Sequence, residues 1–415
     1  MAPSSSYAPH ILPLLGGILA LAAAMGIGRF AYTPLLPAMQ AAAGLDPTQA
    51  GLLAAANYAG YLVGALLAAV AVPASARIHV VLVSAVGVAV TTALMAATTN
   101  LAAWSVVRFI AGLASAGVLV LATGLVLDDL RHQGRASLSG WLFSGIGLGI
   151  VVSGLVVRLT GDLLGWRGDW FLLALLATAA IYPCWRWLPR ARRANALPTS
   201  SPPVLAPARG HPVPIAHVLL FAAYFLEGIG YIVTGTFLVA IVDGTPGLRG
   251  IGADVWIVVG LAVIPSVVLW SALGGHMGYA RALAAAYVLQ AVGIVLPIVG
   301  GAAAAFSAAV LFGGTFAGIT ALTLTLAGHL APSRSAQLIG MLTAVFGVGQ
   351  MIGPVLGGVI ADRAQNFTPA LVAASVCVLA GGALMALLQP FDPLRHGVQA
   401  SSDENSPARS VACEA

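Results

Sequence analysis

Two residues that can bind ions or carry protons, Arg29 and Glu227, lie inside long apolar stretches of the chain. Gly26-Ile27-Gly28 precedes Arg29, and the same tripeptide, Gly228-Ile229-Gly230, follows Glu227 at an offset of 202 residues. A charged side chain at bilayer depth costs about 2.5–3.5 kcal/mol on insertion scales, so such residues usually face a bundle interior or a water-filled cavity. We therefore predict that Arg29 and Glu227 face one central cavity, from two repeats of one fold.

The composition excludes a water-soluble protein. Hydrophobic residues make up 60% of the 415 residues and charged residues 7%, whereas an ordinary soluble domain is about 25% charged. Apolar runs of about 20 residues recur along the chain, which is the length that spans a hydrocarbon core. Backbone groups in lipid require helices or a closed barrel, and continuous apolar runs do not fit the alternating barrel pattern. We predict an all-α polytopic membrane protein.

The apolar runs predict twelve transmembrane helices in two sets of six. Their expected spans are 11–36, 50–72, 79–99, 102–127, 138–158, 169–188, 216–241, 254–273, 281–300, 303–328, 337–360 and 368–389. The Pro-, Ala- and Arg-rich segment 189–215 predicts a flexible linker between them. The expected organisation is an N-terminal tail, a first half, a linker, a second half and a C-terminal tail, at 1–10, 11–188, 189–215, 216–389 and 390–415.

The arginines indicate the orientation. All 18 basic residues are Arg, and of those near helix ends twelve lie on the side of the tails and linker and four on the other side. The positive-inside rule then predicts that both termini are cytoplasmic. We expect a multi-pass protein of a bacterial-type inner (plasma) membrane. The net charge of +5 follows from this orientation and does not indicate nucleic-acid binding.

A second repeat supports two halves of equal topology. The stretches Gly140–Gly149 and Gly340–Gly349 carry glycine at the same first, eighth and tenth positions, at an offset of 200 residues. This offset nearly equals the 202 residues that separate the two Gly-Ile-Gly tripeptides.

With these motifs, the chain resembles a major facilitator superfamily (MFS) transporter from about residue 11 to 390, and more narrowly the YbfB/YjiJ-type family. The stretches that carry the resemblance are Gly26–Pro37, Asn57–Gly64, Arg108–Gly112, Trp166–Phe171 and Tyr224–Tyr231. The resemblance implies two pseudo-symmetric six-helix halves and alternating access to a site between them.

The chain departs from the superfamily pattern in two places. The charged motif expected after the second helix is reduced to one arginine, Arg77. A stretch with antiporter-motif spacing, Gly349–Gly358, lies in the eleventh expected helix, whereas the superfamily motif belongs to the fifth, so we do not infer antiport.

One face of the helix expected at 216–241 is polar. Tyr224, Glu227, Tyr231 and Thr234 follow one another at helical spacing. Under the repeat, Tyr32 of the first helix is the position equivalent to Thr234. Protonation of a carboxyl group in an apolar cavity depends on desolvation and on nearby cations. Glu227 can therefore couple transport to protons; a static ion pair, for example with Arg29, is the alternative.

The arginines and the second helix supply further candidates for the cavity. Arg29 has a planar guanidinium fork that suits carboxylates and phosphates, and Arg108 either contacts substrate or holds helices together. Polar side chains of the helix at 50–72 predict a gate or wall of the cavity, with interhelical hydrogen bonding as the alternative; these are Asn57, Tyr58 and Tyr61.

These residues predict a secondary transporter of a small molecule, with protons as the expected coupling ion. An organic anion is the preferred substrate, since two arginines face one carboxyl group. Proton-coupled efflux of hydrophobic or amphiphilic compounds and a non-transporting membrane sensor or assembly partner remain alternatives. The chain has no lysine and no metal-ligand spacing, so we expect no enzyme activity, ATP hydrolysis, cofactor or metal. We expect the protein to be a monomer in the lipid bilayer. We expect no nucleic-acid partner.

Overall fold

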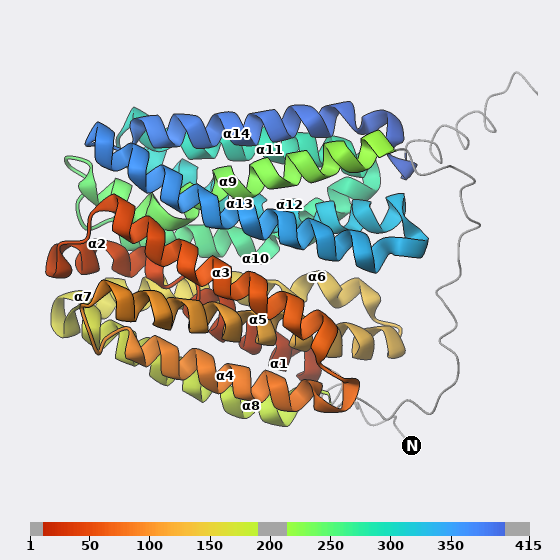
Figure 1. The fold of residues 1–415 in the computed structure, drawn as a ribbon, viewed down its shortest axis with the longest axis horizontal. Helices are drawn as coiled ribbons and strands as arrows, with labels where there is room; N and C mark the ends of the chain where they lie inside the picture. Colours follow the sequence, from red (N-terminus) through yellow and green to blue (C-terminus); the bar gives the residue numbers. More distant parts are fainter. Residues whose placement is uncertain (1–10, 190–213, 395–415) are drawn as a thin grey trace, which may run out of the picture.

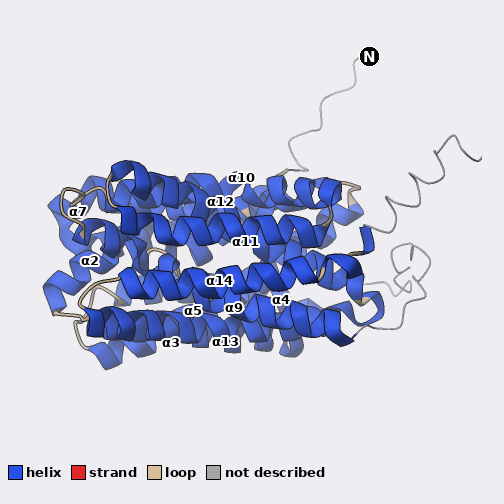
Figure 2. Ribbon diagram, turned by 90° about the horizontal axis from the view of Figure 1, so that it is seen from above, coloured by secondary structure: helices blue, strands red, loops and turns tan. Residues whose placement is uncertain are grey.

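The computed structural model describes residues 11–189 and 214–394. Within these ranges the regular elements are all helices (Figure 2). The predicted tail 1–10 and most of the predicted linker 189–215 and tail 390–415 lie outside the described residues. We call the helices of residues 11–189 the N-terminal set and those of residues 214–394 the C-terminal set.

The N-terminal set runs from α1 to α8. Its elements are α1 (Leu12–Leu21), η1 (Ala22–Ile27), α2 (Tyr32–Ala43), α3 (Pro47–Ala71), η2 (Ala74–Ala76), α4 (Arg77–Leu94), α5 (Leu101–His132), η3 (Ala136–Leu138), α6 (Ser139–Leu142), α7 (Ser144–Ala179) and α8 (Ile181–Trp187). The C-terminal set consists of α9 (Pro214–Gly244), α10 (Gly252–Met277), α11 (Tyr279–Val295), η4 (Leu296–Val299), α12 (Ala302–Leu330), η5 (Pro332–Arg334), α13 (Ser335–Ala364), α14 (Thr368–Leu387) and η6 (Gln389–Phe391).

Eleven helical segments of the described residues are long and apolar enough to cross a membrane. The expected spans fall on these segments, with ends that shift by a few residues. One segment, Ala136–Trp187, contains 52 residues and covers two of the expected spans. The two expected spans leave a connection at 159–168; the structure extends helix into this connection from both sides and has a break at Gly165, where φ is 64°. Gly165 is the one residue of that stretch whose backbone leaves the helical region, and glycine adopts this conformation without steric cost.

Glycines bring the helices of each set into close contact. A Cβ atom on Gly26 of η1 would lie 2.2 Å from the Cα atom of Gly149 in α7, so the two backbones touch. In the C-terminal set, a Cβ atom on Gly349 of α13 would lie 3.1 Å from the Cα atom of Gly228 in α9. Small residues allow such approach between membrane helices. The residues of the two repeats recognised in the sequence thus make equivalent contacts.

The two sets lie on opposite sides of the bundle. In Figure 1, α3, α4, α5 and α8 lie in the lower part and α9, α11, α13 and α14 in the upper part. Pairs from the two sets also pack together, notably α3 with α13, α7 with α10 and α2 with α9.

Among the described residues, four residue pairs join the two sets through polar contacts made by side chains. They are Arg29–Gln350, Thr33–Gly235, Thr48–Asp362 and Arg158–Asp254. The last two pairs lie beside the turns that end α2, α9 and α13, at the left end of the bundle in Figure 1. We call this the latch end. The described chain segments begin and end at the opposite end of the bundle, on the right.

Candidate functional site

The site begins with an irregular stretch in the first membrane segment. Residues Ala22–Ile27 form a π-helix, and residues 28–31 form a turn before α2 begins. Gly28 N donates to Ala23 O at 2.8 Å and Phe30 N donates to Met25 O at 2.9 Å, both one residue wider than in an α-helix. Single π-turns inside helices occur frequently at functional sites. Here the π-turn sets the position of Arg29.

Arg108 of α5 stabilises this irregular turn. Its Nη1 and Nη2 atoms donate to the carbonyl oxygens of Gly28 and Arg29 at 3.5 and 3.4 Å. Its guanidinium carbon lies 4.7 Å from the ring centroid of Tyr32. Asn57 of α3 in turn donates to the carbonyl oxygen of Arg108 at 2.9 Å. Backbone carbonyls freed from a membrane helix need such partners, so Arg108 supports the backbone that carries Arg29.

Arg29 is enclosed by neutral side chains. Its Nη2 atom donates to Oε1 of Gln350 in α13 at 2.9 Å. Its guanidinium carbon lies 4.5 Å from the ring centroid of Tyr58 and 4.3 Å from that of Tyr61, both in α3. The side chain is 3% exposed, and its Nε atom has no hydrogen-bond partner. Cation–π contacts stabilise a desolvated guanidinium but do not neutralise its charge.

The ion pairs of the described residues join Arg131 to Asp128 and Arg158 to Asp254. Arg29 and Glu227 therefore form no ion pair in this structure, and the static pair considered from the sequence is absent.

Stacked aromatic rings of the C-terminal set adjoin Arg29. Gln350 donates from Nε2 to the hydroxyl oxygen of Tyr231. The Tyr231 ring stacks on Phe346 at 5.5 Å and on Phe316 at 5.9 Å between centroids. Tyr224 stacks on the same Phe346 at 4.2 Å, and Phe30 of the N-terminal set meets Phe316 at 6.0 Å. A polar centre is thus bordered by flat apolar surface.

Glu227 lies in a different polar group. Its side chain is 1% exposed and lies beside Gln290 of α11. Its Oε2 atom and both amide atoms of Gln290 have no hydrogen-bond partner that satisfies normal geometry. Tyr287, also in α11, is close to Glu227 and donates to Ala223 O at 3.3 Å. Glu227 therefore faces α11, whereas Tyr224 and Tyr231 of the same helix face α13.

The remaining predicted residues lie around these two groups. Tyr32 donates to Ala50 O at 3.0 Å. Thr234 is completely buried, and its hydroxyl oxygen has no partner. The structure therefore brings Arg29, Arg108, Tyr32, Asn57, Tyr58, Tyr61 and Tyr231 into one connected cluster. Sequence reasoning missed Gln350, Phe346, Phe316 and Gln290. Gln350 lies in the Gly349–Gly358 stretch, and an amide inside an apolar span was the signal that could have found it.

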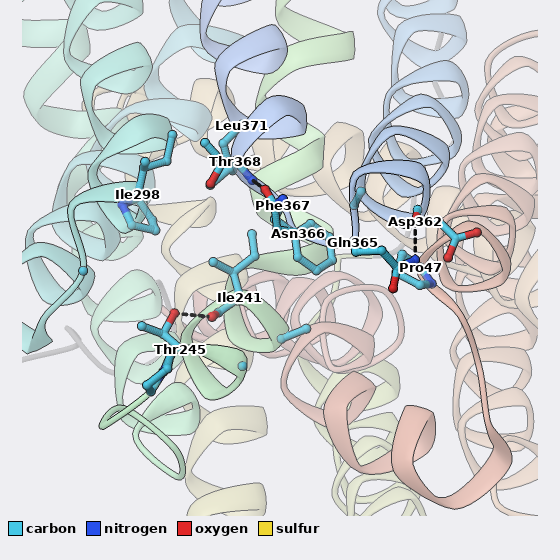
Figure 3. A pocket seen from close by; sticks show the side chains of 16 residues that line it. Pro47, Ile241, Thr245, Ile298, Asp362, Gln365, Asn366, Phe367, Thr368 and Leu371 are labelled. Atoms are coloured by element: carbon cyan, nitrogen blue, oxygen red, sulfur yellow. Dashed lines mark hydrogen bonds between the residues drawn. The ribbon is translucent and has the colours of Figure 1, made fainter.

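A separate pocket of about 470 Å³ opens at the latch end. Figure 3 shows its lining, which comes from the end of α9, from η4, from the turn between α13 and α14, and from Pro47 of α3. Asp362 is its one ionisable lining residue. None of the predicted site residues lines it, so it is distinct from the buried cluster around Arg29. The described residues contain no group of His, Cys, Asp and Glu that could hold a metal ion.

Membrane-length helices packed around buried charged groups are typical of membrane transporters, and comparison with known proteins shows the family. Residues 21–386 match the family model described as "Uncharacterised MFS-type transporter YbfB". The chain belongs to this family of MFS-type transporters, and it is not an enzyme.

One curated relative is a chloramphenicol resistance protein of Streptomyces lividans, 30% identical over 255 residues, which are 61% of this chain and 63% of that protein. The match thus spans less than two thirds of the relative. Two crystal structures of the nucleoside transporter NupG share the fold. One, of a point mutant, aligns with a TM-score of 0.67 at 15% identity, covering 91% of this chain and 98% of that one. The other structure aligns with a TM-score of 0.66 at 16% identity, over 90% and 98%.

Proposed function

We propose that this protein is a secondary transporter that carries small organic anions across a bacterial-type inner membrane by alternating access. The observation that carries the proposal is the Arg29 guanidinium, which is buried and has no carboxylate partner among the described residues. A fixed cation in a low-dielectric interior is stabilised by an anion, and the guanidinium fork suits carboxylates and phosphates. The adjoining Tyr231, Phe316 and Phe346 rings favour an anion with a flat apolar body.

The proposed architecture has twelve membrane passes in two pseudo-symmetric halves. A straight helix of the length of Ala136–Trp187 would extend about 78 Å at 1.5 Å per residue, far beyond a hydrocarbon core of about 30 Å. The break at Gly165 divides it into two passes, which raises the eleven segments to twelve. The equivalent contacts Gly26–Gly149 and Gly228–Gly349 support the repeat, as does the hydrogen bond of 2.5 Å from Thr33 to Gly235, residues 202 apart.

The proposed orientation makes the latch end the outer face. The excess of arginines at the opposite helix ends favours a cytoplasmic location for that side. The Thr48–Asp362 and Arg158–Asp254 contacts then close the outer end. The structure corresponds on this interpretation to a state that is sealed toward the outside. During transport these contacts would open while the halves rock about Arg29.

Glu227 is the proposed site of proton coupling. It is buried and lies beside Gln290, and it forms no ion pair with a cation of the described residues that would fix its charge. Its Oε2 atom lacks a partner in this state. Protonation at Glu227 would act on the substrate site through α9, which also carries Tyr231 of the Arg29 cluster.

Efflux of hydrophobic or amphiphilic compounds is the second candidate function. The chloramphenicol resistance relative and the stacked Tyr224, Phe346 and Tyr231 rings favour it. An efflux protein of this kind would hold its cargo by aromatic surface, with little dependence on Arg29.

Uptake into proteoliposomes tests the proposal. Aromatic monocarboxylates (benzoate, phenylacetate and indole-3-acetate) and the neutral compounds benzamide and chloramphenicol would be supplied to the wild type, Arg29→Gln, Arg29→Lys and the control Arg131→Gln. Arg131 is 70% exposed and, among the described residues, forms an ion pair with Asp128 of its own helix. We expect carboxylate uptake that both Arg29 variants reduce at least tenfold and Arg131→Gln leaves intact. Transport of chloramphenicol but of no carboxylate, unchanged in Arg29→Gln, would refute the anion proposal and favour efflux.

A further inference from the structure

Gln350 makes the one hydrogen bond in the described residues that joins Arg29 to the C-terminal set. Its side chain is 2% exposed and uses both ends of its amide: Oε1 accepts from Arg29 Nη2 at 2.9 Å, and Nε2 donates to the hydroxyl oxygen of Tyr231. The amide oxygen therefore occupies a position on the guanidinium that a carboxylate oxygen would also take.

We propose that Gln350 is an internal competitor of the substrate: its amide oxygen fills the Arg29 site in the empty transporter, and the anionic group of the substrate displaces it. This inference rests on the proposed anion site at Arg29. A buried guanidinium without an acceptor is costly, so some group must satisfy it when substrate is absent. A neutral amide serves this purpose less well than a carboxylate, because its oxygen carries no full negative charge and cannot bind both arms of the guanidinium fork as a carboxylate can. A carboxylate can therefore replace Gln350, whereas it would not easily replace a glutamate.

The displacement has a consequence for the two sets of helices. Arg29–Gln350 is one of the four polar contacts that join the sets among the described residues, and it is distinct from the two contacts at the latch end. A substrate that takes the place of Gln350 removes a direct bond between α13 and the irregular turn of the first segment. It also frees Gln350 to change its bond with Tyr231. Binding of substrate at Arg29 would thereby change how the two sets of helices pack against each other.

Two substitutions by residues of similar size should change the affinity for carboxylates in opposite directions. Gln350→Glu keeps the shape but creates an internal ion pair with Arg29, so we expect benzoate, phenylacetate and indole-3-acetate to bind at least tenfold more weakly. Gln350→Met removes the acceptor oxygen, so we expect about tenfold tighter binding of the same compounds, as the loss of one hydrogen bond to a charged group predicts. Isothermal titration of the purified protein would measure both, with benzamide as the neutral probe that neither variant shifts.

The outcomes separate this inference from the function on which it rests. If Gln350 only supported the fold, or contacted the substrate directly, both variants would weaken carboxylate binding, and the inference would be wrong while the anion site stood. If the wild type bound none of the three carboxylates, the anion site and the inference would both fall. Melting temperatures check that each variant is folded, and the gain in Gln350→Met must vanish when Arg29→Gln is added.

A second readout follows the link between the sets. In a background without cysteine, Thr48→Cys and Asp362→Cys replace a pair that is joined by a hydrogen bond of 3.3 Å at the latch end. We expect benzoate to change the rate of disulfide formation in this pair, and Gln350→Glu to abolish that response. A rate that benzoate leaves unchanged in every variant would contradict the proposed link to the packing of the sets.

Discussion

Substitution of Gly26 by alanine tests the contact that fixes the irregular turn of the first segment. The added Cβ would lie 2.2 Å from Cα and 2.4 Å from the carbonyl carbon of Gly149. Carbon atoms in good contact are about 3.5–4.0 Å apart, so η1 and α7 would have to separate by more than about 1 Å. Overpacking lowers stability by about 1–3 kcal/mol. Because a backbone atom cannot rotate away, we expect a loss of about 3 kcal/mol here. The higher helix propensity of alanine offsets about 1 kcal/mol, which leaves a net loss of about 2 kcal/mol.

Gly124 provides the matched control. It lies within α5, and no atom lies within 4 Å of the Cβ that alanine would add. We expect Gly124→Ala to gain up to about 1 kcal/mol from helix propensity, so the two variants should differ by about 3 kcal/mol. Unfolding by sodium dodecyl sulfate in mixed micelles, followed by tryptophan fluorescence, gives both free energies. Equal stability of Gly26→Ala and Gly124→Ala would refute the inferred backbone contact.

Three further predictions concern transport. Glu227→Gln should abolish uptake driven by a pH gradient yet permit exchange of substrate, since a permanently neutral residue cannot release a proton; gradient-driven uptake at the wild-type rate would remove Glu227 from coupling. Asp254→Asn should weaken the closed latch end by only about 0.2–1 kcal/mol, because the Arg158 partner is 54% exposed; labelling of a cysteine at Thr48 should rise by less than about fivefold, and complete labelling would show a stronger latch. Phe346→Ala should raise the KM for aromatic anions more than that for acetate, because its ring stacks with two tyrosines; an equal rise for both would argue against an aromatic wall.

The helices and the repeat could be predicted from the sequence because their signals are local. A membrane span needs only about 20 apolar residues, and Gly26 and Gly228 stand at the same place in two such spans. The same signals did not reveal that helix extends into 159–168 from both sides of the break at Gly165. The charged residues Arg158, Asp162 and Arg167 made this stretch resemble a loop. Charged residues can also stand in a helix, however, where that helix extends beyond the hydrocarbon core.

The partners of the buried charges could not be predicted in the same way. Helical spacing placed Glu227 with Tyr224 and Tyr231, but a step of three residues turns about 300° around a helix. Glu227 therefore points about 60° away from Tyr224, enough to face α11 instead of α13. Gln350 is 321 residues from Arg29 in the sequence. A contact of this kind depends on how α13 packs against α3 and α9, which no local pattern encodes.

The pair of buried guanidiniums also has an electrical consequence. Arg29 and Arg108 carry fixed charge, and neither has a carboxylate partner among the described residues. Moving one elementary charge through the membrane potential is worth about 2.3 kcal/mol per 100 mV. When the latch end opens and the other end closes, Arg29 and Arg108 become accessible from the other compartment. Their charges thereby cross part of the membrane potential. With Glu227 ionised, the empty carrier would hold one more positive than negative charge. A carrier loaded with one monovalent anion and one proton on Glu227 would hold the same net charge. Voltage would therefore act equally on the loaded and the empty step, and the complete cycle would be electrically neutral.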